Sequence, residues 1–338
     1  MIALTKTLIL VFTLTVSNCF AQDFFPSTLF QLDKKFTHHV LVVEKSTHSL
    51  FLYQYDNQIP KLLKKYQIAT GKMTGNKVLQ GDHKTPEGIY FFQNFHSSEE
   101  LQKKYGETGL IYGAGAFTLN YPNVIDSKKG KTGGGIWLHS TDDDKRVSKG
   151  LDSRGCVVAI DSDLKDISQY IDLTNTPAII VQNLTFLTKE NWELNRNEIN
   201  EVVNNWSKAW VNKEFDTYIN SYSKDEFYSK QGNFYAFKAY KKAVFSRADK
   251  PVIEFRNTSI LHNGEYVVVT MEQDYDSPVV KDIGKKTLYL KKDENYQWKI
   301  VNESFSKLDA ERNIAFTPSM RFFNQQSKKE ITNDSGSI

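Results

Sequence analysis

Short apolar runs separated by polar turns and glycines dominate the chain between residues 40 and 181. Each run is rich in β-branched or aromatic residues, which is typical of strands. Apolar Leu164, Ile167 and Ile171 follow at helical spacing and predict one helix, with Asp161 or Ser162 as its cap. Many strands with few helices predict a β-rich sandwich or barrel-like domain. The predicted strands cover residues 40–44, 49–53, 66–70, 88–92, 116–119 and 135–139.

The hydrophobic pattern changes after residue 182. Polar residues dominate positions 183–195, which we interpret as a linker. A helical period begins next, and the chain then returns to strands, so we predict an α+β domain over residues 196–308. A polar tail follows over 309–338, with disorder expected from Asn324 on. The helical face comprises Ile199, Val202, Val203, Trp206 and Trp210, and the strands cover 252–255, 266–270, 286–290 and 297–301.

Composition and charge fit two folded domains and narrow the choice of partners. The 338 residues are 40% hydrophobic, enough to bury a sizeable core, and domains typically have about 150 residues. The formal net charge is only +3, and no dense stripe of Lys and Arg is present. We therefore expect no nucleic-acid partner, whereas mild basicity suits an anionic polymer such as the cell wall.

The first residues resemble an export signal. Lys6 precedes an apolar run over 8–16, and Ala21 offers a small residue at a cleavage position. The run is too short to span a bilayer, which needs about 20 residues, and no later segment is long and apolar enough. We predict a signal peptide over 1–21 and a soluble periplasmic protein without a transmembrane segment. Lipid attachment at Cys19 is the alternative, disfavoured by the bulky Asn18 before it.

Cysteine and histidine positions argue against a metal or cofactor site. The sequence has two cysteines, and Cys19 would leave with the signal, so only Cys156 would remain. A disulfide within the chain and a cysteine-based zinc site are then excluded. The histidines outside the neighbourhood of Cys156 match no metal-binding spacing.

The neighbours of Cys156 favour a reactive thiol over an inert buried one. His139 closes a predicted strand seventeen residues earlier and could act as the base, while Arg154 adds a fixed positive charge. Gly155 lets the backbone approach closely, so that nearby amides could form an oxyanion hole. Papain-like peptidases have the cysteine before the histidine, so this order argues against them. Arg154 as a structural ion-pair partner and Ser153 as a turn residue remain open alternatives.

Residues 139–156 resemble the signature of the YkuD-type L,D-transpeptidase family, in which a His precedes a Ser/Thr-His-Gly-Cys sequence by about sixteen residues. Residues 84–90 and 117–122 are similar to other stretches of that family, and the resemblance covers 38–182. The later segment resembles an NTF2-like domain. The combination is similar to a subgroup of cell-shape L,D-carboxypeptidases from helical bacteria. Arg154 replaces the usual His, and Val158 stands where many members have Arg.

The resemblance implies a β-rich YkuD-like catalytic domain followed by an α+β NTF2-like domain, with peptidoglycan as the partner. Cys156 would attack the carbonyl between meso-diaminopimelate and the terminal D-alanine of a stem tetrapeptide. His139 would take the thiol proton, with its ring oriented by the backbone carbonyl of Ser140. Arg154 could replace the missing Arg by binding a substrate carboxylate. The second domain would take a small ligand or a protein partner.

The motif leaves the fate of the acyl-enzyme open, because hydrolysis and aminolysis share every step up to it. We expect hydrolysis, and hence an L,D-carboxypeptidase, because the domain pairing and the sequence over 153–156 resemble the trimming subgroup. The first alternative is an L,D-transpeptidase that forms 3-3 crosslinks or attaches another amine. The second is a non-catalytic scaffold that binds the cell wall, although a scaffold needs neither His139 nor Cys156.

Overall fold

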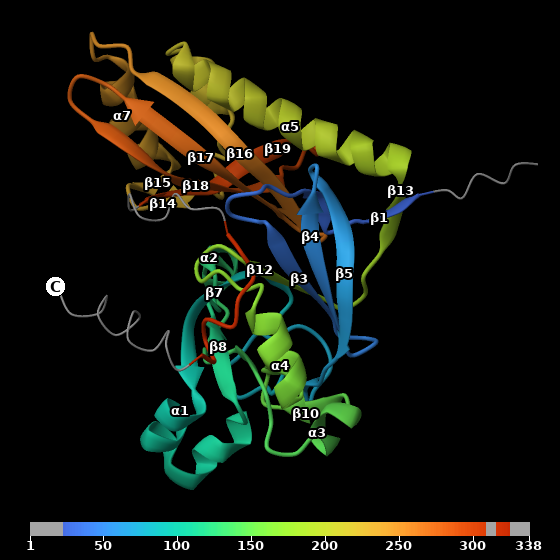
Figure 1. Ribbon diagram of the computed structural model, residues 1–338. Helices are drawn as coiled ribbons and strands as arrows, with labels where there is room; N and C mark the ends of the chain where they lie inside the picture. The colour runs from blue at the N-terminus through green and yellow to red at the C-terminus, as the bar shows by residue number, and fades with distance from the viewer. Residues whose placement is uncertain (1–22, 309–315, 325–338) are drawn as a thin grey trace, which may run out of the picture.

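The computed structural model describes residues 23–308 and 316–324 (Figure 1). The predicted export signal, with Cys19, and most of the predicted tail lie outside the described residues. A β-rich domain lies below an α+β domain in Figure 1, in agreement with the predicted fold class. None of the helices in the described ranges is long and apolar enough to cross a membrane.

The first domain is built on a mixed eight-stranded sheet in the order β11-β9-β8-β7-β12-β3-β4-β5. Strands β3, β4 and β5 are antiparallel neighbours, whereas β12 pairs parallel with β3 and antiparallel with β7. Its strands are β3 (His39–Glu44), β4 (Ser49–Asp56), β5 (Ile59–Gln67), β6 (Thr70–Gly71), β7 (Gly88–Ser97), β8 (Gly115–Leu119), β9 (Trp137–His139), β10 (Leu151–Ser153), β11 (Val157–Val158) and β12 (Pro177–Val181).

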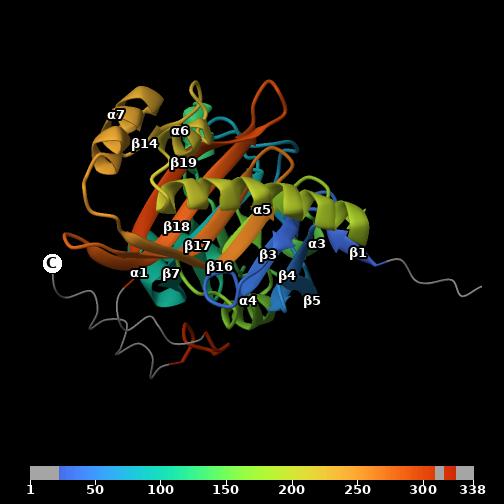
Figure 2. The ribbon, with the colours of Figure 1, turned by 90° about the horizontal axis from the view of Figure 1, so that it is seen from above.

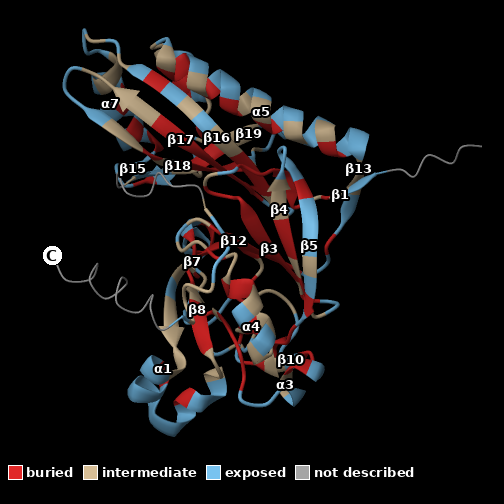
Figure 3. Cartoon of the chain, in the orientation of Figure 1, coloured by how far each residue is buried: buried red, intermediate tan, exposed pale blue. Residues whose placement is uncertain are grey.

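Short helices surround this sheet, and α1 and α3 are largely exposed (Figure 3). The helix predicted after Cys156 is present as α4, and Leu164 and Ile167 are fully buried. The predicted cap at Asp161 or Ser162 is wrong: Ile160 is the N-cap and makes no side-chain cap bond. The helices are α1 (Ser98–Tyr105), the 3-10 helix η1 (Gly106–Tyr112), α2 (Val124–Lys128), α3 (Lys145–Ser148) and α4 (Asp161–Ser168).

The second domain has a five-stranded antiparallel sheet in the order β19-β18-β17-β16-β2. The long helix α5 crosses this sheet (Figure 2). The edge strand β2 comes from the N-terminal segment before the first domain, a pairing that the sequence pattern did not predict. The elements are β1 (Phe24–Pro26), β2 (Leu29–Gln31), β13 (Phe186–Thr188), α5 (Lys189–Val211), α6 (Phe215–Asn220), β14 (Tyr228–Ser229), β15 (Gly232–Asn233), α7 (Phe234–Phe245), β16 (Val252–His262), β17 (Val267–Asp276), β18 (Lys281–Lys292) and β19 (Trp298–Lys307).

The segment interpreted as a linker, 183–195, contains β13 and the first turns of α5. The Thr188 side chain caps the helix by accepting a hydrogen bond from the Asn191 N–H. Trp192 anchors this turn, because it is almost fully buried and its indole N–H donates to the Leu29 carbonyl at 2.8 Å. The segment has a polar composition because most side chains in the first turns of α5 are exposed. One buried tryptophan, Trp192, was too weak a signal to predict a helix there.

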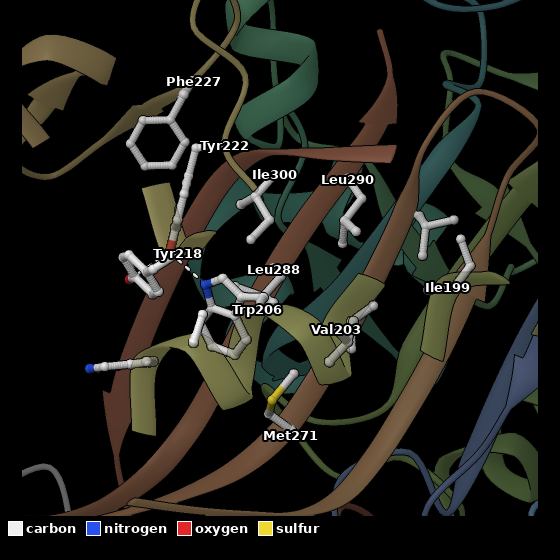
Figure 4. Close-up of a cluster of buried hydrophobic side chains, with 14 of the residues drawn as sticks. Ile199, Val203, Trp206, Tyr218, Tyr222, Phe227, Met271, Leu288, Leu290 and Ile300 are labelled. Carbon is white, nitrogen blue, oxygen red and sulfur yellow. Dashed lines mark hydrogen bonds between the residues drawn. The ribbon is translucent and has the colours of Figure 1, made fainter. Parts of the chain in front are cut away.

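The predicted apolar face of α5 packs on the second sheet, as expected for an amphipathic helix. Ile199, Val203 and Trp206 face Met271 and neighbouring strand residues in the core (Figure 4). The Trp206 indole N–H donates to the Tyr222 hydroxyl at 2.8 Å. Trp206 and its neighbour Trp210 are therefore core residues, as the sequence indicated.

The two domains share an apolar core. Tyr266, which immediately precedes β17, is almost fully buried, and its hydroxyl accepts hydrogen bonds from the Ile89 N–H at 2.8 Å and the Asn123 side chain at 2.9 Å. Apolar residues of both sheets surround this contact. They are Val40, Val42, Ile89, Phe91, Ile179 and Val181 from the first domain and Leu29, Leu261, Tyr266, Val268, Tyr289 and Val301 from the second sheet.

Residues 316–324 pack back onto the first domain, a contact that the sequence did not predict. The Phe316 ring stacks on His38 with a centroid distance of 3.8 Å. Phe322 packs edge-on against Phe117 at 4.9 Å. The Arg321 guanidinium donates to the Ile171 carbonyl at 2.9 Å. Residues 316–324 therefore belong to the first domain by their contacts, although they follow the second domain in sequence.

Candidate active site

Strands β9 and β11 bring His139 and Cys156 together at one edge of the first sheet. The two strands are parallel, with Val157 opposite Leu138. Cys156, one residue before Val157, therefore lies beside Trp137. Side chains alternate along a strand, so Trp137, His139 and Cys156 face the same side of the sheet. The topology thus brings together the residues that the sequence predicted as base and nucleophile.

His139 is held as a neutral base. Its Nδ1–H donates to the Ser140 carbonyl at 2.5 Å, which leaves Nε2 unprotonated and able to accept a proton. The Tyr112 ring meets the imidazole edge-on, with a centroid distance of 5.0 Å. Burial lowers the pKa of His139 to about 4, although the bond to Ser140 opposes this shift. The imidazole is therefore uncharged at neutral pH.

Cys156 is held as a neutral thiol. Its Sγ–H donates to the Gly135 carbonyl at 3.5 Å. Burial raises the pKa of Cys156 to about 11, and the Trp137 backbone N–H and the Arg146 charge oppose this rise. The side chain is only partly exposed. Because thiol and imidazole are both neutral, the nucleophile would form as the proton moves to His139 during attack.

Ser153 and Gly155 shape the turn before Cys156. The Ser153 hydroxyl accepts a hydrogen bond from the Gly155 N–H at 3.0 Å and donates to the Cys156 carbonyl at 2.6 Å. Gly155 has φ +127°, and a Cβ there would lie 2.8 Å from the Lys84 carbonyl oxygen. In the described chain the backbone N–H groups of Arg154 and Cys156 have no acceptor, so both are available to an oxyanion.

The two arginines near the site differ in their partners. Arg154 is exposed and makes no ion pair or hydrogen bond with the described residues. Arg146, which the sequence reasoning missed, donates through Nε to Asp152 at 2.7 Å and through Nη1 to the Thr141 hydroxyl at 3.1 Å. The i, i+4 spacing of Asp142 and Arg146 was the available signal in the sequence.

The segment with Gly113, Ala114 and Gly115, which carried no prediction, connects η1 to Ser140, the residue after His139. The Ser140 hydroxyl accepts from the Ala114 N–H at 2.7 Å and donates to the Tyr112 carbonyl at 3.2 Å. Asp161 accepts from the same Ala114 N–H at 2.9 Å. A Cβ on Gly113 would lie 2.5 Å from the Asp161 carboxylate, so only glycine fits. Ser140 therefore orients His139 and also positions Tyr112 beside it.

The second domain contains a buried charge cluster around Glu303. Glu303 accepts from Lys286 at 3.0 Å and lies 3.9 Å from Lys241. Burial lowers the pKa of Lys241 to about 8, although Glu303 opposes this shift. The domain has no cysteine, and His262 is its single histidine. Within the described residues, no group of three His, Cys, Asp or Glu side chains could hold a metal ion.

Comparisons with known proteins agree with this division of the chain. Residues 38–180 match the L,D-transpeptidase catalytic domain of the YkuD family, and residues 198–304 match the Cds6 C-terminal NTF2-like domain. No curated protein sequence matches the chain.

Solved structures that are similar over both domains include the following two proteins. Bd1075 of Bdellovibrio bacteriovorus is 31% identical, with a TM-score of 0.74 over 85% of this chain and 100% of that one. The helical cell shape determining protein Pgp2 of Campylobacter jejuni is 26% identical, with a TM-score of 0.64 over 82% of this chain and 96% of that one.

Proposed function

Because the chain belongs to the YkuD family of peptidoglycan L,D-transpeptidases and carboxypeptidases and carries a C-terminal NTF2-like domain, we propose that it is an exported L,D-carboxypeptidase. It would act in the periplasm and cleave the bond between meso-diaminopimelate and D-alanine in stem tetrapeptides. The observation that carries this proposal is the pairing of Cys156 with a neutral, oriented His139 on adjacent strands. The similarity to a cell shape determining protein supports a role in cell shape.

The proposed reaction begins with attack of Cys156 Sγ on the diaminopimelate carbonyl carbon. Nε2 of His139 takes the thiol proton, and the Ser140 carbonyl stabilises the resulting imidazolium through Nδ1–H. The N–H groups of Arg154 and Cys156 would bind the oxyanion. Collapse of this intermediate breaks the peptide bond, and His139 returns the proton to the D-alanine amine. A water, deprotonated by His139, then attacks the thioester and releases the tripeptide and the thiol.

Arg154 would bind a carboxylate of the substrate. Its guanidinium is exposed and unpaired among the described residues, so its planar fork is free for bidentate binding. Arg154→Lys keeps the charge but loses this geometry, and we expect a higher KM with an unchanged melting temperature. A large drop in melting temperature with normal kinetics would instead indicate a structural role.

Mass analysis of products tests the proposed function. The purified protein is incubated with disaccharide-tetrapeptides, and Cys156→Ala is the matched control. We expect tripeptide and free D-alanine in equal amounts, with none from the control. Crosslinked dimers joined between two diaminopimelate residues as the main product would identify a transpeptidase and retain the catalytic assignment. Absence of any product that depends on Cys156 would favour the scaffold.

The NTF2-like domain would bind or position the substrate rather than catalyse. It lacks a cysteine, so it offers no thiol nucleophile of its own. Export would depend on residues 1–21. Expression of the full chain in a Gram-negative host, followed by mass analysis of the periplasmic protein, should give a polypeptide that starts near Gln22. An uncleaved or lipid-modified chain would contradict this prediction.

A further inference from the structure

Four aromatic side chains form a continuous wall that starts at the catalytic residues, and we define this aromatic wall as His96, Tyr105, Tyr112 and Trp137. The Trp137 ring lies 5.0 Å from Tyr112, 5.9 Å from His96 and 6.5 Å from Tyr105, measured between ring centroids. Tyr112 in turn contacts the imidazole of His139. The rings therefore extend outward from the base.

The aromatic wall is partly open to solvent, unlike the aromatic clusters of the two cores. Tyr105 is 38% exposed, and the other three rings are partly exposed. The neighbouring η1 residues Leu110 and Ile111 are 47% and 41% exposed. Solvent-exposed aromatic rings in mutual contact beside the proposed catalytic groups are typical of a ligand-binding site.

The wall is also held rigidly, which reduces the entropy that a ligand would lose on binding. Ser140 and Asp161 fix the backbone at Ala114, just after η1. Arg146 donates to the Ile111 carbonyl at 3.1 Å. Trp137 is fixed by its place in β9, two residues before His139.

From this geometry we infer that the aromatic wall binds a sugar ring of the glycan strand that carries the stem peptide, an inference that rests on the proposed function. Tyr105 lies 6.1 Å from Tyr112, which lies 5.0 Å from His139, so Tyr105 is at most about 11 Å from the base. Three stem residues separate the scissile bond from the sugar, and three extended residues span about 10–11 Å. The sugar can therefore reach Tyr105 while the scissile carbonyl is at Cys156.

The chemistry of the substrate favours the sugar over the peptide as the occupant. The stem residues alanine, glutamate and diaminopimelate offer methyl groups and charges, which suit Arg154 better than aromatic rings. The C–H face of a pyranose is the largest apolar surface of the substrate, and burying it on Tyr and Trp rings is favourable. Alanine substitution of one such ring should therefore weaken binding of a glycan-linked stem by about five- to tenfold.

The test compares two substrates with the same stem: a disaccharide-tetrapeptide and the free tetrapeptide. The full chain is assayed as unmutated protein, Tyr105→Ala and Tyr105→Phe, with Tyr235→Ala as the control. Tyr235 is 69% exposed on α7, in the other domain. The measured quantity is the ratio of kcat/KM for the disaccharide-tetrapeptide to kcat/KM for the free tetrapeptide.

We expect Tyr105→Ala to lower this ratio about five- to tenfold, mainly through KM, while Tyr105→Phe and Tyr235→Ala retain it. An unchanged ratio in Tyr105→Ala, or equal losses on both substrates, would overturn the glycan subsite and leave the proposed function intact. A defect confined to transfer onto an amine acceptor would also overturn it, by placing the acceptor peptide on the wall. Failure of the unmutated protein on both substrates would instead refute the proposed function.

Discussion

Replacement of Tyr266 by phenylalanine tests whether the shared core joins the two domains into one cooperative structure. The change removes a single oxygen from a side chain that is 2% exposed. That oxygen accepts the Ile89 N–H at 2.8 Å and a side-chain N–H of Asn123 at 2.9 Å. The Asn123 amide also donates to the Ile89 carbonyl at 3.0 Å, so its remaining N–H depends on Tyr266.

The expected cost follows from leaving two donors unpaired in a buried interface. A buried, unsatisfied hydrogen-bonding group costs about 1–3 kcal/mol, so Tyr266→Phe should reduce the free energy of unfolding by about 2–4 kcal/mol. Two domains that unfold together as nearly 300 residues lose about 1.5–2 °C in melting temperature per kcal/mol, because the unfolding entropy grows with chain length. The melting temperature should therefore fall by about 3–8 °C. The space left by one hydroxyl is smaller than a water molecule, so water is not expected to restore the bonds.

Differential scanning calorimetry of the full chain measures this effect, with Tyr296→Phe as the control. Tyr296 is 79% exposed, so its substitution should leave the melting temperature within about 1 °C of the unmutated protein. A single transition for the unmutated protein would support a shared core. A Tyr266→Phe protein that melts with the control would refute the reasoning, because the two hydrogen bonds would then contribute nothing to the interface.

Three further predictions concern the active site and the second domain. The pH profile of kcat/KM should fall below about pH 4, where His139 becomes protonated, and above about pH 11, where Cys156 ionises. A profile that falls near pH 6.5 and near pH 8.5 would contradict a neutral thiol and a neutral imidazole. Gly155→Ala should lower kcat/KM about a hundredfold by displacing the nucleophile, whereas Gly264→Ala, at φ +92° with open space around it, should not. Glu303→Gln removes the counter-charge of two buried lysines and should lower the free energy of unfolding, measured in urea, by about 3–5 kcal/mol. A decrease below about 1 kcal/mol would show that this cluster does not stabilise the domain.

The sequence by itself determined many of the strands, the helices α4 and α5, and the proposed base and nucleophile. Strands and the helix α5 follow from short-range periodicity, which depends on which side chains a strand or helix presents to one face. The order and spacing of His139 and Cys156, with Gly155 before the thiol, indicated a cysteine nucleophile with a histidine base, because these residues form one short motif. All of these signals lie within a few residues of one another or within one recognisable stretch of the chain.

Tertiary structure decided what depends on contacts between distant segments. Leu29 joins the second sheet opposite Leu261, and residues 316–324 return to the first domain, although neither pairing leaves a local pattern. Arg146 lies near His139 and Cys156 because the segment between β9 and β11, which contains α3 and β10, folds back on itself. Gly113 is required because Asp161, from another helix, occupies the space of its side chain. Burial shifts the pKa values of His139 and Cys156, because the exclusion of solvent depends on the whole packed structure and not on the composition of one segment. The same packing places the Tyr112 ring against the His139 imidazole.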